Sequence, residues 1–380
     1  MSQSQEVRLH DVMRLDLAPC RVEAGRTYPN IGIYSFGRGT FSKPPIEAAS
    51  TSAQTLYRVS AGQVIYSRLF AFEGAYSTVP AEHDGAYVSN EFPTFSIDED
   101  RAVPAFIGWL FRWEGTWAAL RKRTVGMGDR RQRIHPDSVL SHTIRLPSRS
   151  EQLAVVARLD YVAQRLSERR GRAEIIDSEI GSTLRAAFAR IIADAPHVTM
   201  GEIAPLVRRP VTIDPDGSYP ELGVRSFGKG TFQKPALPGI EVGTKKLFTV
   251  EAGDLVFNIV FAWEGAVAVS SSGDAGRVGS HRFLTCVPDP DRATADFLRF
   301  WFLSEEGMLA LSQASPGGAG RNRTLGIKAL EAIKVPVPSL DAQLWFDSLQ
   351  AKARAAKAAQ AEATAHLDQL LPAMLNEVFG

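Results

Sequence analysis

The sequence predicts a mixed α/β (α+β) protein with two homologous globular domains and two long helices that pair antiparallel. Three observations support this fold class. A segment near the N-terminus recurs in the middle of the chain, short β-type runs fill the first part of each copy, and a long helical pattern ends it. Two homologous units in one chain usually pack about a pseudo-twofold axis, as a homodimer does, so we expect that symmetry here.

The repeat is clearest at a glycine-rich turn. Tyr28 begins the segment YPNIGIYSFGRGTFSKP, and Tyr219, 191 residues later, begins YPELGVRSFGKGTFQKP. The same offset aligns residues 56–75 with residues 247–266. Because this offset holds without a gap from residue 7 to the C-terminus, chance does not explain it. The chain therefore consists of two copies of one unit of ordinary domain size.

The first part of each copy has a mixed pattern. In the first copy, β-type runs cover residues 56–59 and 64–67, on either side of a turn at Gly62, and residues 88–97 are also β-rich. Residues 104–120 begin at a proline and are rich in aromatics and alanine, which predicts a helix. This succession of elements is the basis for the mixed α/β assignment.

The sequence changes character at Pro147. Residues 150–193 contain no proline, and their apolar residues recur at helical spacing, which predicts a helix on the order of 60 Å long. The equivalent segment follows Pro338 and should kink or break at Pro372. A narrow apolar stripe on a charged helix needs a partner helix. We therefore expect the two helices to pair antiparallel, with the globular units at opposite ends.

The composition excludes several classes of protein. With 380 residues, 44% of them hydrophobic, and a net charge of +1, the chain is not a wholly basic nucleic-acid protein, although local basic patches remain compatible with it. Its two cysteines, Cys20 and Cys286, do not match in the repeat, so neither a disulfide framework nor a zinc site is supported. No apolar run has membrane-spanning length and the start is not a signal peptide, so we expect a cytoplasmic location and no membrane.

Catalytic motifs are missing from the sequence. There is no G-x-S-x-G elbow, Walker A loop or H-E-x-x-H pair, and the Gly-Arg-Gly and Gly-Lys-Gly turns lack phosphate-loop spacing. Glu73 and Glu264 coincide in the repeat without a second matched acid, which favours a structural carboxylate that bonds the N–H groups of a turn. We therefore expect a chain that is not itself an enzyme.

The ordered set of motifs resembles the specificity (S) subunit of type I restriction-modification systems, over essentially the whole chain. The resemblance is carried by residues 62–67, 84–93 and 126–133, and by the Pro-Ser-x-x-x-Gln start of each long helix. It implies two target-recognition domains joined by conserved helical spacers that form a coiled coil. The implied boundaries are 1–148 and 194–338 for the recognition domains, and 149–193 and 339–380 for the spacers.

The resemblance implies a non-catalytic, sequence-specific DNA-binding subunit that recognises a bipartite double-stranded DNA target in phage defence. The helices would dock methyltransferase (M) subunits, two in the usual assembly, and a restriction (R) subunit can join. No cofactor is implied in this chain, because S-adenosylmethionine, and ATP with Mg where restriction occurs, belong to the partner subunits. Two alternatives remain open: a specificity subunit of a methylation-only or other phage-defence complex, and a DNA-independent helical scaffold.

Candidate DNA-binding residues follow from charge and from the comparison of the two copies. Phosphate contacts supply most of the affinity and base-edge contacts the sequence choice. Cations near the turns or in the arginine-rich loops are the phosphate candidates: Arg38, Lys43, Arg130, Arg131, Lys229, Lys234, Arg321 and Arg323. Positions that differ between the copies are the base-reading candidates, in the pairs Tyr34/Arg225, Arg68/Ile259, Ser67/Asn258 and Asn90/His281. For each of these, a surface position without a role is an equally compatible interpretation.

Four phenylalanines flank the glycine turns, two in each copy: Phe36, Phe41, Phe227 and Phe232. Stacking on bases is one interpretation, but we expect them to pack in the core of the turn. Because the two copies are alike, we also expect them to read related half-sites in inverted orientation.

Overall fold

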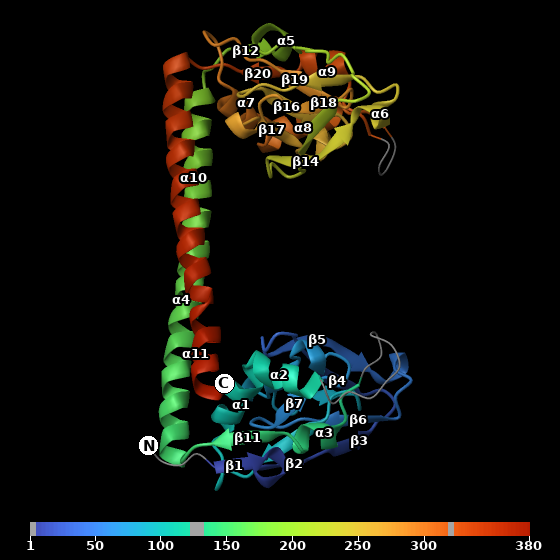
Figure 1. Cartoon of the computed structure of the whole chain (residues 1–380), viewed down its shortest axis with the longest axis vertical. Coiled ribbons are helices and arrows are strands. Elements are labelled where there is room, and N and C mark those ends of the chain that lie inside the picture. The colour runs from blue at the N-terminus through green and yellow to red at the C-terminus, as the bar shows by residue number, and fades with distance from the viewer. Residues whose placement is uncertain (1–4, 122–132, 318–322) are drawn as a thin grey trace. The chain divides into compact units, whose positions relative to one another are not determined.

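The computed structural model describes residues 5–121, 133–317 and 323–380. The chain forms two compact units, one made of Met1–Glu174 with Gln360–Gly380, and the other of Ile175–Ala359 (Figure 1). Both units combine β-sheets with helices, which confirms the mixed α/β fold. The long helix α4 (Arg149–Ile192) begins in the first unit and ends in the second. Each unit therefore contains part of both long helical segments.

The first unit is built on two sheets and a strand pair. Its strands are β1 (Gln5–Arg8), β2 (Met13–Leu15), β3 (Ala18–Arg21), β4 (Thr27–Ile33), β5 (Thr40–Glu47), β6 (Thr55–Arg58), β7 (Val64–Tyr66), β8 (Tyr76–Thr78), β9 (Tyr87–Val88), β10 (Thr94–Ile97) and β11 (Thr143–Leu146). The sheets have the orders β3-β6-β9-β4-β5 and β2-β10-β7-β8, while β1 pairs with β11. The β4–β9 pair is parallel, and the other pairs are antiparallel.

The second unit repeats this plan. Its strands are β12 (His197–Thr199), β13 (Ser218–Val224), β14 (Thr231–Pro238), β15 (Leu247–Thr249), β16 (Leu255–Asn258), β17 (Val267–Val269), β18 (Val278–Ser280), β19 (Phe283–Cys286) and β20 (Lys334–Pro336). The sheets have the orders β14-β13-β18-β15 and β17-β16-β19, while β12 pairs with β20. In both units, the glycine turn joins the two longest strands into one antiparallel hairpin, β4–β5 or β13–β14.

Short helices complete each unit. The first has α1 (Pro104–Arg112), α2 (Glu114–Arg121), α3 (Pro136–Leu140) and the 3₁₀ helices η1 (Leu9–Asp11), η2 (Ala48–Ser50), η3 (Ala71–Glu73) and η4 (Ala81–His83). The second has α5 (Met200–Ile203), α6 (Gly239–Val242), α7 (Ala295–Phe302), α8 (Glu305–Gln313), α9 (Ile327–Ala332), η5 (Ala262–Glu264) and η6 (Ser272–Asp274).

The expectation of one helix over residues 104–120 is wrong, because the chain breaks between α1 and α2. Trp113 has an extended backbone, with φ −75° and ψ 127°, and its ring lies so close to Gly115 that a Cβ there would approach it to 2.2 Å. Thr116 then donates from its hydroxyl to the carbonyl of Leu110, at 2.8 Å. A large ring therefore packs on a glycine at the break, a contact that helix propensity alone does not reveal.

The long helical segments pack antiparallel in each unit, as expected. The C-terminal segment consists of α10 (Leu340–Asp368) and α11 (Leu370–Phe379). Two ion pairs show the opposite directions of the helices. In the first unit, Arg158 near the start of α4 pairs with Glu377 near the end of the C-terminal segment, at 3.2 Å. In the second unit, Asp177 further along α4 pairs with Lys357, which lies earlier in that segment, at 3.5 Å. The break between α10 and α11 precedes Pro372, which lies in the first turn of α11. Proline is tolerated there because an N–H group in the first turn of a helix has no intrahelical acceptor. No helix in the described ranges is both long and apolar enough to cross a membrane.

A buried glutamine fixes the start of each long helix to the neighbouring domain. Gln152 Oε1 accepts from the backbone N–H of Val103 at 2.8 Å, just before α1. Gln343 Oε1 accepts in the same way from Thr294 at 3.0 Å, just before α7. Both side chains are at most 1% exposed, and each also donates to the proline carbonyl that precedes its helix, at 2.9 Å. The glutamine of the Pro-Ser-x-x-x-Gln motif is therefore a structural joint.

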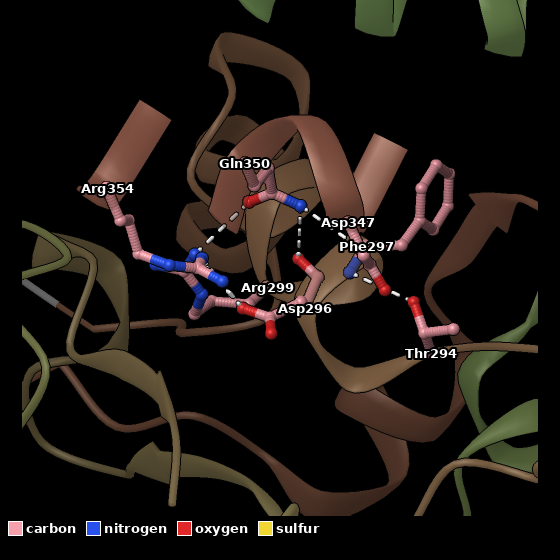
Figure 2. Close-up of polar contacts among 7 residues, drawn as sticks. All are labelled: Thr294, Asp296, Phe297, Arg299, Asp347, Gln350 and Arg354. Carbon is pink, nitrogen blue, oxygen red and sulfur yellow. Dashed lines mark hydrogen bonds and ion pairs between the residues drawn. The ribbon is translucent and has the colours of Figure 1, made fainter. Parts of the chain in front are cut away.

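In the second unit, polar side chains extend this joint along α7 and α10 (Figure 2). Gln350 Oε1 accepts from Arg299 at 3.2 Å, and Asp296 forms ion pairs with Arg299 at 3.3 Å and Arg354 at 3.2 Å. Burial lowers the pKa of Arg299 and raises that of Asp347, which also accepts from Gln350. These contacts orient α7 on α10 and involve no residue of the hairpin β13–β14.

Candidate nucleic-acid interface

The tips of the two hairpins have the same backbone conformation. Phe36 and Phe227 lie in the left-handed region, with φ values of 63° and 62°, and the following glycines also have positive φ. Phe36 N–H donates to the carbonyl of Glu73 and Phe227 N–H to that of Glu264, both at 2.8 Å. The tip of each hairpin is therefore bonded to the 3₁₀ helix that ends in the matched glutamate, η3 or η5.

The matched glutamates hold the hairpins through their side chains as well. Glu73 accepts a hydrogen bond from the hydroxyl of Ser35 at 2.9 Å, and Glu264 accepts one from Ser226 at 3.0 Å. The expectation of a structural carboxylate is thus correct in kind but wrong about the donor. The carboxylate accepts a hydrogen bond from a serine hydroxyl of the hairpin, because the N–H groups of the turn already donate to backbone carbonyls.

A second matched contact lies at the first residue of the outer strand, and sequence comparison missed it. His83 Nδ1 lies 2.8 Å from the hydroxyl of Thr40, and Asp274 accepts from the hydroxyl of Thr231 at 2.9 Å. Burial disfavours the charge of Asp274, but the hydrogen bonds from Ser271 and Thr231 outweigh it and lower the pKa of this carboxyl. The threonine is identical in the two copies, but its partner is a histidine in one and an aspartate in the other. Comparison of the two sequences therefore did not indicate that these positions make the same contact.

The expectation that all four phenylalanines pack inward is wrong for two of them. Phe36 is 63% exposed and Phe227 is 73% exposed. Phe41 is half-buried, stacks on Tyr34 with ring centres 4.2 Å apart, and lies over Gly32, where a Cβ would come within 2.6 Å of its ring. The left-handed backbone directs Phe36 and Phe227 at the tips into solvent, while Phe41 on β5 covers Gly32 on the paired strand β4.

The predicted phosphate-binding cations lie around the same tips. Arg38 and Lys229 are exposed on the turns, while Lys43 lies on β5 and Lys234 on β14. In the described ranges, none of these four cations has an acidic partner. Each instead lies near an aromatic ring of the hairpin, for example Arg38 at 5.0 Å from the ring centre of Tyr34. Their charges remain available to an anion.

The arginine-rich loops are only partly described. Arg130, Arg131 and Arg321 lie outside the described residues. Arg323 is described, and its guanidinium lies 5.2 Å from the ring centre of Trp263, beside η5. The basic group of the second copy therefore extends to the 3₁₀ helix that holds the hairpin tip.

Two of the base-reading candidates of the first unit share a pocket. Arg68 and Asn90 both line a cleft of about 200 Å³, together with Tyr57 and His135. Arg68 Nε is buried and has no hydrogen-bond partner in the described part of the chain. Because a buried donor without a partner is costly, this nitrogen is suited to an acceptor that arrives with a ligand.

The second unit places different chemistry at the equivalent positions. Ile259 replaces Arg68, and Asn258 uses its side-chain oxygen to accept from the N–H of Val260 at 3.0 Å. Asn258 keeps its amide N–H₂ for another partner, and His281 is exposed. The sequence therefore pointed to positions that lie together in the first unit, and these positions differ in donor pattern between the units. No group of three or more potential metal ligands occurs among the described residues.

Comparison with known proteins relates this fold to solved structures of type I restriction-modification systems. No protein-family model and no curated protein matches the chain. The HsdS subunit from Thermoanaerobacter tengcongensis is 19% identical, with a TM-score of 0.55 over 99% of this chain and 96% of that one. A chain of a type I R-M system, from a structure concerned with complex assembly and conformational transition, is 18% identical, with a TM-score of 0.70 over 98% and 96%. The type I restriction-modification S subunit from M. genitalium is 12% identical, with a TM-score of 0.53 over 100% and 96%.

Proposed function

We propose that this chain is the sequence-specific DNA-binding subunit of a type I restriction-modification complex. The single observation that carries the proposal is the likeness of fold, over 98–100% of the chain, to solved structures of type I restriction-modification systems, two of which are S subunits. The duplicated hairpin carries cations on both copies that have no acidic partner among the described residues, and this gives the likeness a chemical basis. Each unit would read one half of a bipartite double-stranded DNA target.

We assign phosphate contacts to the cations of the hairpins and arginine-rich loops. These are Arg38, Lys43, Arg130, Arg131, Lys229, Lys234, Arg321 and Arg323. Base reading falls to the positions that differ between the units, Arg68 and Asn90 in the first, and Asn258 and His281 in the second. Arginine reads guanine and asparagine reads adenine through paired hydrogen bonds, so unlike donors at equivalent positions would give half-sites that are related but differ at the bases these residues contact.

The partners follow from the same proposal. The paired helical segments would dock two methyltransferase subunits, which bring S-adenosylmethionine, and a restriction subunit with ATP and Mg would join where restriction occurs. The chain itself supplies no catalytic residue in this scheme. Co-purification with the products of neighbouring genes, followed by mapping of methylated sites in the host, tests the assignment. A purified complex that shows no salt-dependent binding to duplex DNA would instead favour a DNA-independent scaffold.

Neutralising the matched lysines should weaken DNA binding without changing its sequence preference. We expect Lys43→Gln and Lys234→Gln each to reduce the salt dependence of log Kobs by about one unit, because each removes one phosphate contact. Titration of the methyltransferase complex with duplex DNA at several salt concentrations measures this slope. Lys334→Gln, at an exposed position of β20 outside the hairpin and the long helices, is the matched control and should leave the slope unchanged.

Replacing Arg68 should alter one half of the target only. Arg68→Ile gives the first unit the residue that the second unit has at this position, and removes the buried nitrogen that lacks a partner. We expect discrimination at one base pair to fall by about 1–3 kcal/mol, so that the methylated motif relaxes at that position. Methylome sequencing reads the motif directly. Relaxation in both halves, or in neither, contradicts the assignment.

A further inference from the structure

We propose that Phe36 and Phe227 act as wedges that enter the base stack of duplex DNA, one in each half-site. This inference rests on the proposed DNA-reading function and adds to it the side chain that distorts the duplex. It goes beyond the expectation from sequence, which placed both rings in the core of the turn. It is carried by the backbone strain, the exposure and the surroundings of the two rings.

The first observation is the strain. Throughout the described residues, Phe36 and Phe227 are the only positions other than glycine with positive φ. The left-handed conformation is unfavourable for a bulky side chain, and asparagine or glycine adopts it more readily. Strain of this kind persists where surrounding contacts impose it, and it clusters at ligand-binding sites. Here it occurs twice, at equivalent positions of the two copies.

The second observation is that the strain places the rings in solvent. The two rings are 63% and 73% exposed, so packing of these rings within the protein does not compensate for the unfavourable backbone. The tips are nevertheless held firmly. The N–H groups of Gly37 and Gly228 donate to the carbonyls of Gly74 and Gly265, both at 2.9 Å, and the serine before each phenylalanine bonds its glutamate. Each hairpin therefore exposes an aromatic ring on a tip whose backbone is held in place by hydrogen bonds.

The third observation concerns what the rings would meet. A cation follows each phenylalanine by two residues, Arg38 in one unit and Lys229 in the other. The ammonium of Lys229 lies 5.8 Å from the ring centre of Phe227. Glycines on both sides of the cation permit close approach of a backbone. An aromatic ring beside a cation that has no acidic partner among the described residues suits a polyanion with stacked π faces, and apolar wedges unstack base steps in this way in other DNA-binding proteins.

The test uses the complex with its methyltransferase subunits and a duplex that carries the mapped target. With 2-aminopurine placed along each half-site in turn, we expect binding to raise its fluorescence at one step in each half. Phe36→Asn should abolish the rise in one half and weaken binding about tenfold, and Phe227→Asn should do the same in the other half. Asparagine accepts the left-handed backbone, so the thermal midpoint of the chain should not fall.

The control is Ile240→Asn, which replaces a side chain that is 80% exposed just after β14, at the end of the hairpin away from the turn. It should leave both fluorescence signals unchanged. Tight binding by the wild-type complex without any fluorescence rise, or wild-type behaviour of Phe36→Asn, overturns the wedge and leaves the proposed function standing. Loss of assembly with the methyltransferase subunits in Phe36→Asn overturns it in favour of a protein contact. Absence of salt-dependent DNA binding by the wild-type complex overturns both.

Discussion

Gln343→Leu is expected to destabilise the joint between α7 and α10 by roughly 3 kcal/mol or more. The side chain is fully buried and makes three hydrogen bonds to backbone groups: it accepts from Thr294 and donates to the carbonyls of Arg292 and Pro338. Leucine fills a similar volume but leaves all three groups without a partner, and each buried unsatisfied group costs about 1–3 kcal/mol. Gln152→Leu should cost less, because within the described part of the chain Gln152 bonds only Val103 and Pro147.

Hydrogen exchange resolved by peptide measures this effect locally, since a chain of two units need not unfold in one step. The amides of α7 should lose protection in Gln343→Leu, while those of α1 keep it. Leu344→Ala, at an exposed position on the same helical turn, is the control and should exchange like the wild type. Undiminished protection of α7 in Gln343→Leu would show that the glutamine does not maintain the joint.

The repeat offset made much of this architecture predictable from sequence. It aligned Gln152 with Gln343 and Glu73 with Glu264 before any contact was known. Helical periodicity likewise located the long helices, because a charged helix with a narrow apolar stripe buries that stripe most simply against a second helix. What the alignment could not give was the role of each matched residue, since burial and hydrogen-bond partners depend on segments far away in the chain.

The exposed phenylalanines show where sequence reasoning fails. An aromatic residue between apolar strands is normally buried. The tripeptide Ser-Phe-Gly does not predict a left-handed backbone at its phenylalanine, because residues other than glycine rarely adopt that conformation. The conformation is imposed by bonds to Glu73 and Glu264, 37 residues further along in each copy. The pairing of His83 with Asp274 escaped for a related reason, because unlike side chains hold the same threonine hydroxyl.

Phe346→Ala is expected to destabilise the second unit by about 4 kcal/mol. Phe346 on α10 is fully buried, and its ring centre lies 5.2 Å from that of Phe188 on α4 and 4.8 Å from that of Phe300 on α7. Truncation of a buried phenylalanine to alanine costs about 3–5 kcal/mol through lost burial and the cavity left behind. Because the pair with Phe300 is edge-to-face, at 82°, its loss raises the expected value above the lower end of that range.

The effect should stay within the second unit, because the first unit has Val155 at the position equivalent to Phe346 and uses Phe379 against Phe106 instead. Trp345→Ala provides a stringent control, since it removes a larger side chain from the preceding residue of the same helix, which is 54% exposed. Hydrogen exchange should show faster opening of α7 and of the Ile175–Ile192 part of α4 in Phe346→Ala, and neither change in Trp345→Ala. Equal losses in the two variants would mean that helix propensity, rather than the aromatic cluster, holds this unit to its helices.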